Sequence, residues 1–400
     1  MSSSPRPETT LASPPSWPDA QRETDFNVWL TRLAPAHGLV IGSLRSACAD
    51  ASFRRYLRVN GSRGSYIIMD APPDKEDCRP FVKVAQLLHQ AQVHAPDVLA
   101  WDAAHGFMLL TDLGAQTMMQ VIQPDKPQAN LSLYLQAVDA LIAWQSASTP
   151  GILPPYDEAL LRRELELFPD WYLARHRGVP VEGEVRRTLD QAFAQIVAHN
   201  LAWPSVYVHR DFMPRNLMVL DIAPTLATAC AALPPEGAVP AWGGPTPKPQ
   251  APTLATACAA LPSTRLGVLD FQDAVYGPIT YDIASLMRDA FLSWDEEFCL
   301  DITIRYWEKA RQAGLPVGDD FGEFYRGVEW MGLQRHLKVA GIFARLTLRD
   351  GKPQYLADTP RFINYIRATC ARYRELKPLL RLIERVEGLV VADGYAFGRI

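Results

Sequence analysis

Two polar runs, each directly after a short apolar segment, constrain the fold of this chain most. The first extends from His209 to Asn216 after residues 206–208, and the second from Asp270 to Asp273 after residues 266–269. Apolar segments of this length, bounded by polar residues, predict short buried strands. Because functional side chains gather where such strands end, we expect the two runs to meet in space.

The residue types in these runs suit the transfer of a phosphoryl group. Asp211 is the candidate general base that accepts the proton of an acceptor hydroxyl. Asn216 and Asp270 are candidate Mg²⁺ ligands, since Mg²⁺ prefers hard oxygen donors. Taken singly, the three residues also have ordinary interpretations: a surface aspartate, a turn asparagine and a helix-capping aspartate. Their order and their positions at strand ends favour the catalytic interpretation.

Further polar residues surround these three. Asp273 is a candidate for binding a substrate hydroxyl, for contacting the metal or for supporting the site, and the sequence leaves these roles open. His209 is expected to organise the loop through hydrogen bonds. Asp282 begins an amphipathic segment, where it either caps a helix or braces the loop from behind.

Composition restricts the class of protein. The 400 residues, 48% hydrophobic and 21% charged, predict a soluble protein with a sizeable core and two lobes. A net charge of −4 argues against a general nucleic-acid-binding surface, and no apolar run reaches the length of a membrane span. None of the six cysteines forms a CxxC pair, which favours reduced thiols in a cytoplasmic protein over a zinc or redox motif.

The sequence pattern divides the chain into three parts. Residues 1–22, rich in Ser, Pro and Thr, are predicted to be a disordered leader. Residues 23–114 form an expected β-rich, nucleotide-binding lobe, with Thr24 or Asp25 capping its first helix and a hairpin turn at Asn60-Gly61. From residue 115 to residue 400, helical periodicity predicts a larger helical lobe that carries both polar runs.

A duplicated insertion separates the two runs. Twelve residues at 223–234 recur identically at 251–262, so that Pro-, Ala- and Gly-rich sequence occupies residues 223–264. Such composition predicts a loop. It interrupts the expected hairpin that carries Asn216 and Asp270, and either a tolerated surface insertion or a functional lid fits this position.

The motifs resemble those of the aminoglycoside-phosphotransferase and choline-kinase-like superfamily, from about Phe26 to Tyr373. The resemblance implies an α+β fold of the bilobal protein-kinase type, with a small β-rich N-lobe and a larger helical C-lobe. It also implies ATP in the cleft between them, with Mg²⁺. By this resemblance Asp211 matches the catalytic aspartate, Asn216 and Asp270 match the metal ligands, and Asp282 matches a structural aspartate.

Three longer motifs resemble one branch of that superfamily. They lie at residues 209–218, 269–282 and 334–345. The branch consists of bacterial kinases that act on the anomeric hydroxyl of N-acetylmuramate and N-acetylglucosamine. The resemblance implies an ATP-dependent amino-sugar kinase in the recycling of cell-wall sugars, with a small-molecule partner and neither nucleic acid nor membrane. A kinase of the same fold for another acceptor (an aminoglycoside, choline, homoserine or another sugar) and a non-catalytic nucleotide-binding regulator remain the alternatives.

The chain departs from the kinase pattern on the nucleotide side. It has no G-x-G-x-x-G loop, and if the family pattern holds, Ser52 contacts phosphate in its place. The strand lysine that usually binds phosphate is also missing, so that Arg54 or Arg55 is the expected substitute. Asp112, in the Gly-containing connector between the lobes, is a further candidate for nucleotide binding.

Acceptor recognition is carried by fewer residues. Arg335 and Lys338 are three positions apart and share a face of an expected helix. They are candidates for binding the lactyl carboxylate of N-acetylmuramate, and a solvated basic face is the open alternative.

Overall fold

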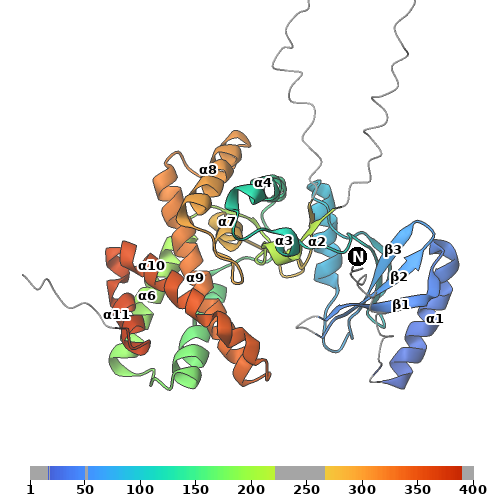
Figure 1. The fold of residues 1–400 in the computed structure, drawn as a ribbon, viewed down its shortest axis with the longest axis horizontal. Helices are drawn as coiled ribbons and strands as arrows, with labels where there is room; N and C mark the ends of the chain where they lie inside the picture. Colours follow the sequence, from blue (N-terminus) through green and yellow to red (C-terminus); the bar gives the residue numbers. More distant parts are fainter. Residues whose placement is uncertain (1–16, 18, 50–52, 221–265, 390–400) are drawn as a thin grey trace, which may run out of the picture.

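The computed structural model describes residues 17, 19–49, 53–220 and 266–389. Ser52, the insertion at 223–264 and most of the predicted leader lie outside these ranges. The described residues form a small lobe built on a β-sheet and a larger lobe of helices (Figure 1). The predicted bilobal α+β fold is therefore confirmed.

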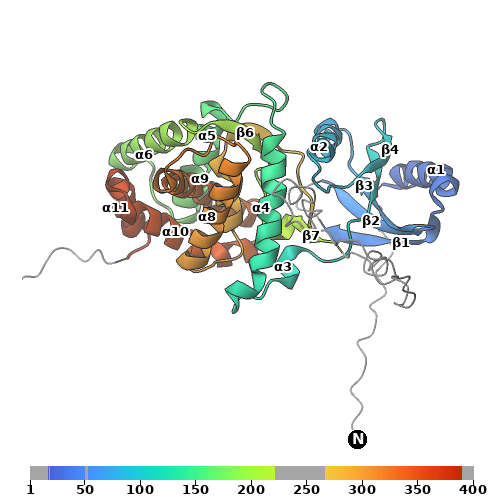
Figure 2. The ribbon, with the colours of Figure 1, turned by 90° about the horizontal axis from the view of Figure 1, so that it is seen from above.

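The small lobe contains a five-stranded antiparallel sheet with the strand order β1-β2-β3-β5-β4. Its strands are β1 (Val40–Ala49), β2 (Arg55–Gly61), β3 (Gly64–Asp70), β4 (Val98–Asp102) and β5 (Phe107–Thr111). Two helices accompany it, α1 (Ala20–His37) and α2 (Arg79–Gln90). The helix α2 lies on the side of the sheet nearer to the large lobe, and α1 lies on the outer side (Figures 1 and 2).

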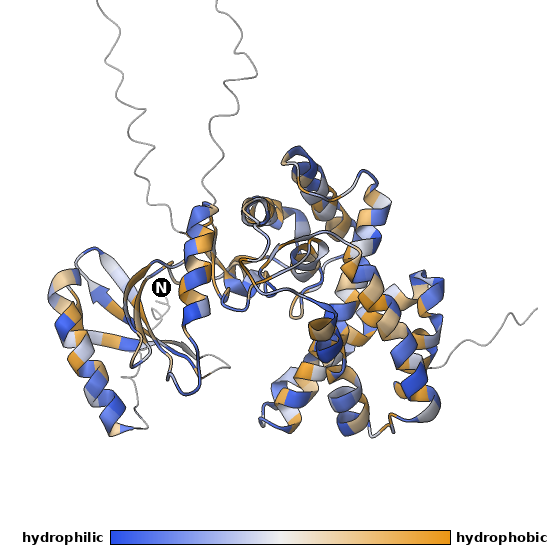
Figure 3. Ribbon diagram, turned by 180° about the vertical axis from the view of Figure 1, so that it is seen from behind, coloured by the Kyte–Doolittle hydropathy of each residue, from blue (hydrophilic) through white to orange (hydrophobic). Residues whose placement is uncertain are grey.

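The two faces of the sheet are packed by alternating residues, as the pleat of a strand requires. Ile68 and Leu109 pack with the α1 residues Phe26, Trp29 and Leu30. Their neighbours Met69 and Leu110 belong instead to the main core of the molecule, with α2 residues such as Val84. Figure 3 shows hydrophobic and hydrophilic residues along α2, which is the pattern of a half-buried helix.

The start of α1 differs from the prediction. Its N-cap is Asp19, whose side chain accepts a hydrogen bond from the backbone N–H of Gln21 at 2.9 Å. The proposed caps Thr24 and Asp25 are wrong, because both lie inside the helix, where the Thr24 hydroxyl donates to the carbonyl of Ala20. Residues 20–22, assigned to the leader from the sequence, belong to α1. Gly38 ends the helix in the left-handed conformation, as expected.

The predicted β2–β3 hairpin exists, but its turn lies two residues later than predicted. Gly61 pairs with Gly64, so that Ser62 and Arg63 form the turn. A Cβ atom at Gly61 would collide with the ring of Tyr66. The glycine is therefore needed for close packing along the strand, and the Asn-Gly pair does not mark the turn.

The large lobe is mainly helical. Its helices are α3 (Met118–Val121), α4 (Leu131–Ser146), α5 (Glu158–Leu165), α6 (Gly183–Leu201), α7 (Thr280–Met287), α8 (Glu296–Gln312), α9 (Phe321–Leu348), α10 (Thr359–Arg372) and α11 (Lys377–Val386). Short 3-10 segments are η1 (Pro127–Asn130), η3 (Pro214–Asn216), η5 (Pro353–Asp358) and η6 (Arg374–Leu376), and η2 (Phe168–His176) is a π-helix. The long helix α9 crosses this lobe and packs against α7, α10 and α6 (Figure 1). None of the helices in the described ranges is long and apolar enough to cross a membrane.

Two small ladders carry the polar runs. β6 (Ser205–Val208) pairs with β9 (Val275–Pro278), and β7 (Leu217–Val219) pairs with β8 (Leu266–Val268), both antiparallel. The backbone N–H of Val268 also donates to the carbonyl of His94 at 2.8 Å, which ties β8 to the segment after α2. Both predicted runs thus follow buried strands.

We expect that replacing residues 224–262 by a short Gly/Ser linker preserves folding. The reason is that the β7–β8 pairing is complete up to Val219 and Leu266, so that a tight connection between them is possible. Circular dichroism and the thermal unfolding midpoint of the two chains provide the comparison. If the shortened chain folds but binds nucleotide or acceptor markedly more weakly, the insertion has a functional role and is not merely a tolerated surface loop.

Candidate active site

The first polar run leaves β6 and is held by a buried carboxylate. Asp282, in the first turn of α7, accepts hydrogen bonds from the backbone N–H groups of His209 at 2.7 Å and Arg210 at 3.0 Å. Burial raises the pKa of Asp282 to about 7, against the lowering effect of these two hydrogen bonds. The side chain of Asp282 therefore holds the backbone just before Asp211. It is not the N-cap of α7, which is Ile279.

Two residues of the site have left-handed backbone conformations. Arg210 has φ 77° and Asp270 has φ 63°. Such angles are costly for residues with a Cβ and persist only where the surroundings impose them. They turn the chain sharply at Arg210, just before Asp211, and at Asp270 itself, directly after Leu269.

His209 connects the two runs. Its ring Nε2 lies 3.1 Å from the carbonyl oxygen of Leu269, and the backbone N–H of Asp211 points to its Nδ1 at 3.3 Å. Burial lowers the pKa of His209 to about 4, so the ring is neutral at neutral pH. These contacts assign the ring proton to Nε2, which donates to Leu269, while Nδ1 accepts. This is the kind of contact that the predicted organising role requires.

Asn216 and Asp270 lie side by side. The Asn216 side-chain Nδ2 donates to the Asp211 carbonyl at 2.9 Å and to Asp270 Oδ2 at 3.3 Å, and Gln272 Nε2 donates to Asp270 Oδ1 at 2.9 Å. The Leu269 N–H donates to the Asn216 carbonyl at 2.9 Å, which fixes the two runs together. The expectation that Asp211, Asn216 and Asp270 meet agrees with this geometry.

The oxygens of this pair fit a divalent cation. An amide and an adjacent exposed carboxylate supply the hard donors that Mg²⁺ takes while it keeps waters and phosphate oxygens. No group of three His, Cys, Asp or Glu suited to a metal exists among the described residues.

A buried ionic cluster lies behind the loop of residues 209–216, and its central residue, Glu164 of α5, was not identified from the sequence. Its carboxylate pairs with Arg210 at 2.5 Å and Lys338 at 2.9 Å, and the Tyr156 hydroxyl donates to it. Burial would raise the pKa of Glu164, but Lys338 and Arg210 lower it to about 2. Glu164 adjoins the apolar residue Leu165 on the buried face of α5, and a charge at such a position is the signal that the sequence offered.

Arg335 and Lys338, both on α9, are placed beside this cluster. Arg335 is 4% exposed; its Nη1 donates to the Arg210 carbonyl at 2.6 Å, and its guanidinium lies over the ring of Tyr281. Lys338 contacts Glu164 and the Tyr281 hydroxyl. Their predicted role with a substrate carboxylate stays a prediction, and the contacts seen are to the protein. Asp273 is exposed near them, with its carbonyl 3.5 Å from Arg210 Nη1.

On the small lobe, the two adjacent arginines point to opposite faces of the sheet. Arg55 pairs in register with Asp70 on the α1 side, where Asp70 also accepts from Arg22 Nε at 2.9 Å. Arg54 pairs at 3.9 Å with Glu76, which lies in the segment between β3 and α2. Arg54 lies just before β2, and its pairing with Glu76 joins it to the segment that leads into α2 on the side of the large lobe (Figure 1).

Asp112 lies in the connector between the lobes. Arg58 pairs with its carboxylate at 2.7 Å, the Ser65 hydroxyl donates to it at 2.6 Å, and the backbone N–H of Gly114 donates at 3.0 Å. These contacts fasten the connector to β2 and β3. The predicted contact of Asp112 with a nucleotide remains a prediction.

Comparison with known proteins gives this geometry its context. The profile of the phosphotransferase enzyme family matches residues 44–226 and 262–319. The chain is 45% identical to the N-acetylmuramate/N-acetylglucosamine kinase of Pseudomonas aeruginosa, over 91% of this chain and 97% of the relative. It is 44% identical to the protein of the same name from Neisseria meningitidis serogroup B, over 92% and 97%.

Solved structures show the same fold. The GDP complex of wild-type aminoglycoside 2′-phosphotransferase-IIIa aligns with a TM-score of 0.51 at 14% identity, over 87% of this chain and 98% of that one. At this identity the likeness concerns the fold alone.

The ionic cluster leads to a pH-dependent prediction for Glu164→Gln. The folded-state pKa of Glu164, about 2, lies below its ordinary 4.5, so the stability that it contributes is present above 4.5 and is lost as the pH falls. We expect the free energy of unfolding of the variant to be about 3 kcal/mol below that of the parent near pH 7, and this difference to become smaller as the pH falls from about 5 to about 3. Denaturant unfolding of both proteins across this pH range measures the difference.

The control is Glu158→Gln on the same helix, whose carboxylate is 59% exposed and pairs only with Arg162 at the surface. It should change stability by well under about 1 kcal/mol at any pH. A gap for Glu164→Gln that is as large near pH 3 as near pH 7 would show that its charge does not carry the effect.

Proposed function

From the premise that this chain belongs to the phosphotransferase enzyme family, we propose that it is an ATP-dependent kinase of amino sugars. Its acceptors are N-acetylmuramate and N-acetylglucosamine, and its products are their 1-phosphates. The reaction belongs to the recycling of cell-wall amino sugars in the cytoplasm. The acceptor rests on one observation, the likeness to relatives of that name over nearly the whole length of both chains.

The chemistry of transfer rests on the arrangement around Asp211. The oxygen of the acceptor hydroxyl attacks the terminal phosphorus of ATP, the bond from that phosphorus to the bridging oxygen breaks, and ADP leaves. The hydroxyl proton passes to the Asp211 carboxylate, which also orients the acceptor. An anomeric hydroxyl is more acidic than an ordinary alcohol, so a carboxylate is a sufficient base.

Asn216 and Asp270 are the residues that would hold Mg²⁺. When bound, Mg²⁺ would supply positive charge that offsets the negative charge developing on the phosphoryl group during transfer. The protein itself contributes the placement of the two ligands. The left-handed Asp270 turns its carboxylate toward Asn216, and the Asn216 amide is anchored on the Asp211 carbonyl, so that base and ligands share one rigid unit.

On the nucleotide side, Arg54 takes the part of the absent strand lysine. Its position on the α2 side and its pairing with Glu76 resemble in kind the lysine–glutamate ion pair that positions phosphates in protein kinases. Asp112 and Ser52 complete the proposed nucleotide contacts. Asp273 is assigned to a hydroxyl of the sugar, because its exposed carboxylate follows the Asp270 segment near Arg210.

The product tests the acceptor. Phosphorus NMR of a reaction with ATP, Mg²⁺ and either sugar should show the 1-phosphate. Formation of a 6-phosphate, or no reaction with either sugar while another alcohol is phosphorylated, would move the proposal to another acceptor.

The variant Asp211→Asn tests the base. It should lower turnover by ~10²–10⁴ while nucleotide still binds, because the acceptor loses its base. Turnover of Asp211→Asn within a factor of about two of the parent would remove Asp211 from its role.

The two arginines provide a matched pair for the nucleotide site. Arg54→Ala should raise the KM for ATP by ~10-fold or more and lower kcat, because a charge-assisted contact to phosphate is lost. Arg55→Ala, one position along the chain and on the opposite face, should lower the thermal midpoint and leave the KM for ATP within about two-fold, since it contacts Asp70. A larger ATP effect at Arg55 than at Arg54 would reverse the assignment.

A further inference from the structure

Arg210, which precedes the proposed base, is held at its backbone N–H, at its carbonyl and at the end of its side chain. Its backbone N–H donates to Asp282 at 3.0 Å, its carbonyl accepts from Arg335 Nη1 at 2.6 Å, and its side chain pairs with Glu164 at 2.5 Å. Its φ of 77° is a conformation that such contacts must impose. Whatever fixes Arg210 therefore also fixes the direction in which the chain enters Asp211.

Glu164 reaches Arg210 by two routes. The first is the direct ion pair with the Arg210 side chain. The second passes through α9, where Lys338 binds Glu164 and Arg335, one turn earlier, binds the Arg210 carbonyl. Glu164 thus connects α5, α9 and the catalytic loop through a single carboxylate that is 5% exposed.

The charges explain why a carboxylate is required at this position. Arg210, Lys338 and Arg335 are three cations packed together behind the loop, and each costs free energy to bury unless an anion faces it. Asp282 meets the backbone N–H groups of the loop, which leaves Glu164 as the carboxylate that pairs with the side chains of Arg210 and Lys338. Without Glu164, the two cations repel each other directly behind Asp211.

We propose that Glu164 is a positioning residue for catalysis, which acts through Arg210 and Arg335 to hold Asp211 in line with the acceptor hydroxyl. This role rests on the proposed function, in which Asp211 is the base. It predicts a loss of turnover without a loss of binding, because Glu164 contacts neither substrate. It also predicts an equal loss of turnover with both sugars, since the cluster then positions the loop and does not bind the lactyl carboxylate.

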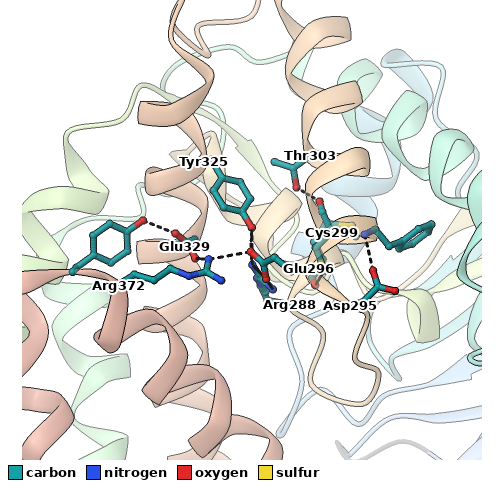
Figure 4. Close-up of polar contacts among 11 residues, drawn as sticks. Arg288, Asp295, Glu296, Cys299, Thr303, Tyr325, Glu329 and Arg372 are labelled. Atoms are coloured by element: carbon teal, nitrogen blue, oxygen red, sulfur yellow. Dashed lines mark hydrogen bonds and ion pairs between the residues drawn. The ribbon is translucent and has the colours of Figure 1, made fainter.

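Glu329 provides the matched control. It is also 5% exposed, and it also faces an arginine and a tyrosine, Arg372 and Tyr373. Figure 4 shows that this group of contacts, with Glu296 and Arg288, joins helices of the large lobe. The partners of Glu329 lie on α10 and directly after it, and not in residues 209–216. Glu329→Gln therefore removes an equally buried charge from the same kind of surroundings.

The experiment compares Glu164→Gln and Glu329→Gln by steady-state kinetics with each sugar. We expect Glu164→Gln to lower kcat by between ~10-fold and ~10²-fold with both KM values within about two-fold of the parent, as a small displacement of a reacting group does. Glu329→Gln should lose stability and keep its kcat. A parent-like kcat for folded Glu164→Gln overturns the proposal, and so does a defect confined to the KM for N-acetylmuramate.

A second measurement does not need the acceptor. Amide hydrogen exchange of residues 209–216 should be faster in Glu164→Gln than in the parent and unchanged in Glu329→Gln, because the loop loses its clamp. Unchanged exchange in Glu164→Gln overturns the proposal. Failure of the proposed function looks different, since the parent itself would then phosphorylate neither sugar.

If Glu164→Gln does not fold, Glu164→Gln/Lys338→Met removes one anion and one cation together and is compared with Lys338→Met. A kcat of the double variant below that of Lys338→Met supports the positioning role. Equal kcat values for these two proteins overturn it.

Discussion

The two hydrogen bonds from the backbone of His209 and Arg210 to Asp282 are the contacts on which the rest of the site depends. They attach the end of β6 to the start of α7 inside the core, where a lost acceptor would leave two N–H groups unpaired. The turn at Arg210 and the position of Asp211 depend on that attachment. The second polar run, residues 270–273, is joined to the first by two hydrogen bonds, one between the His209 ring and the Leu269 carbonyl and one from the Asn216 amide to the Asp270 carboxylate.

Much of this was accessible from the sequence because it is encoded locally. Short apolar segments before His209 and Asp270 predict strands, and strand ends place polar residues together. That Asp211, Asn216 and Asp270 lie close together could therefore be predicted before any coordinates. The bilobal fold followed from the same motifs together with the resemblance.

Other features depend on partners that are distant in the chain. The ion pairs of Glu164 form only when α5 packs against α9 and the loop, so its role could not be predicted from the local sequence. Arg54 and Arg55 could not be distinguished until their different partners, Glu76 and Asp70, were known. The N-cap of α1 was predicted at the wrong residue because Thr24 and Asp25 are as suitable by residue type as Asp19. The hairpin turn was predicted two residues too early because Gly61 is required by the ring of Tyr66, which comes later in the chain, and not by a turn. Residue type alone does not decide between such neighbours.

The opposite facing of Arg54 and Arg55 has a consequence for how the length of this protein can evolve. Loss of one residue directly after Arg55 would place Arg54 opposite Asp70 and turn Arg55 to the other face of the sheet. Such a deletion would break the ion pairs of both arginines. Between Val219 and Leu266, by contrast, the chain already spans more than forty residues without altering the register of β7 and β8. Relatives should therefore differ freely in length at the second place and hardly ever at the first.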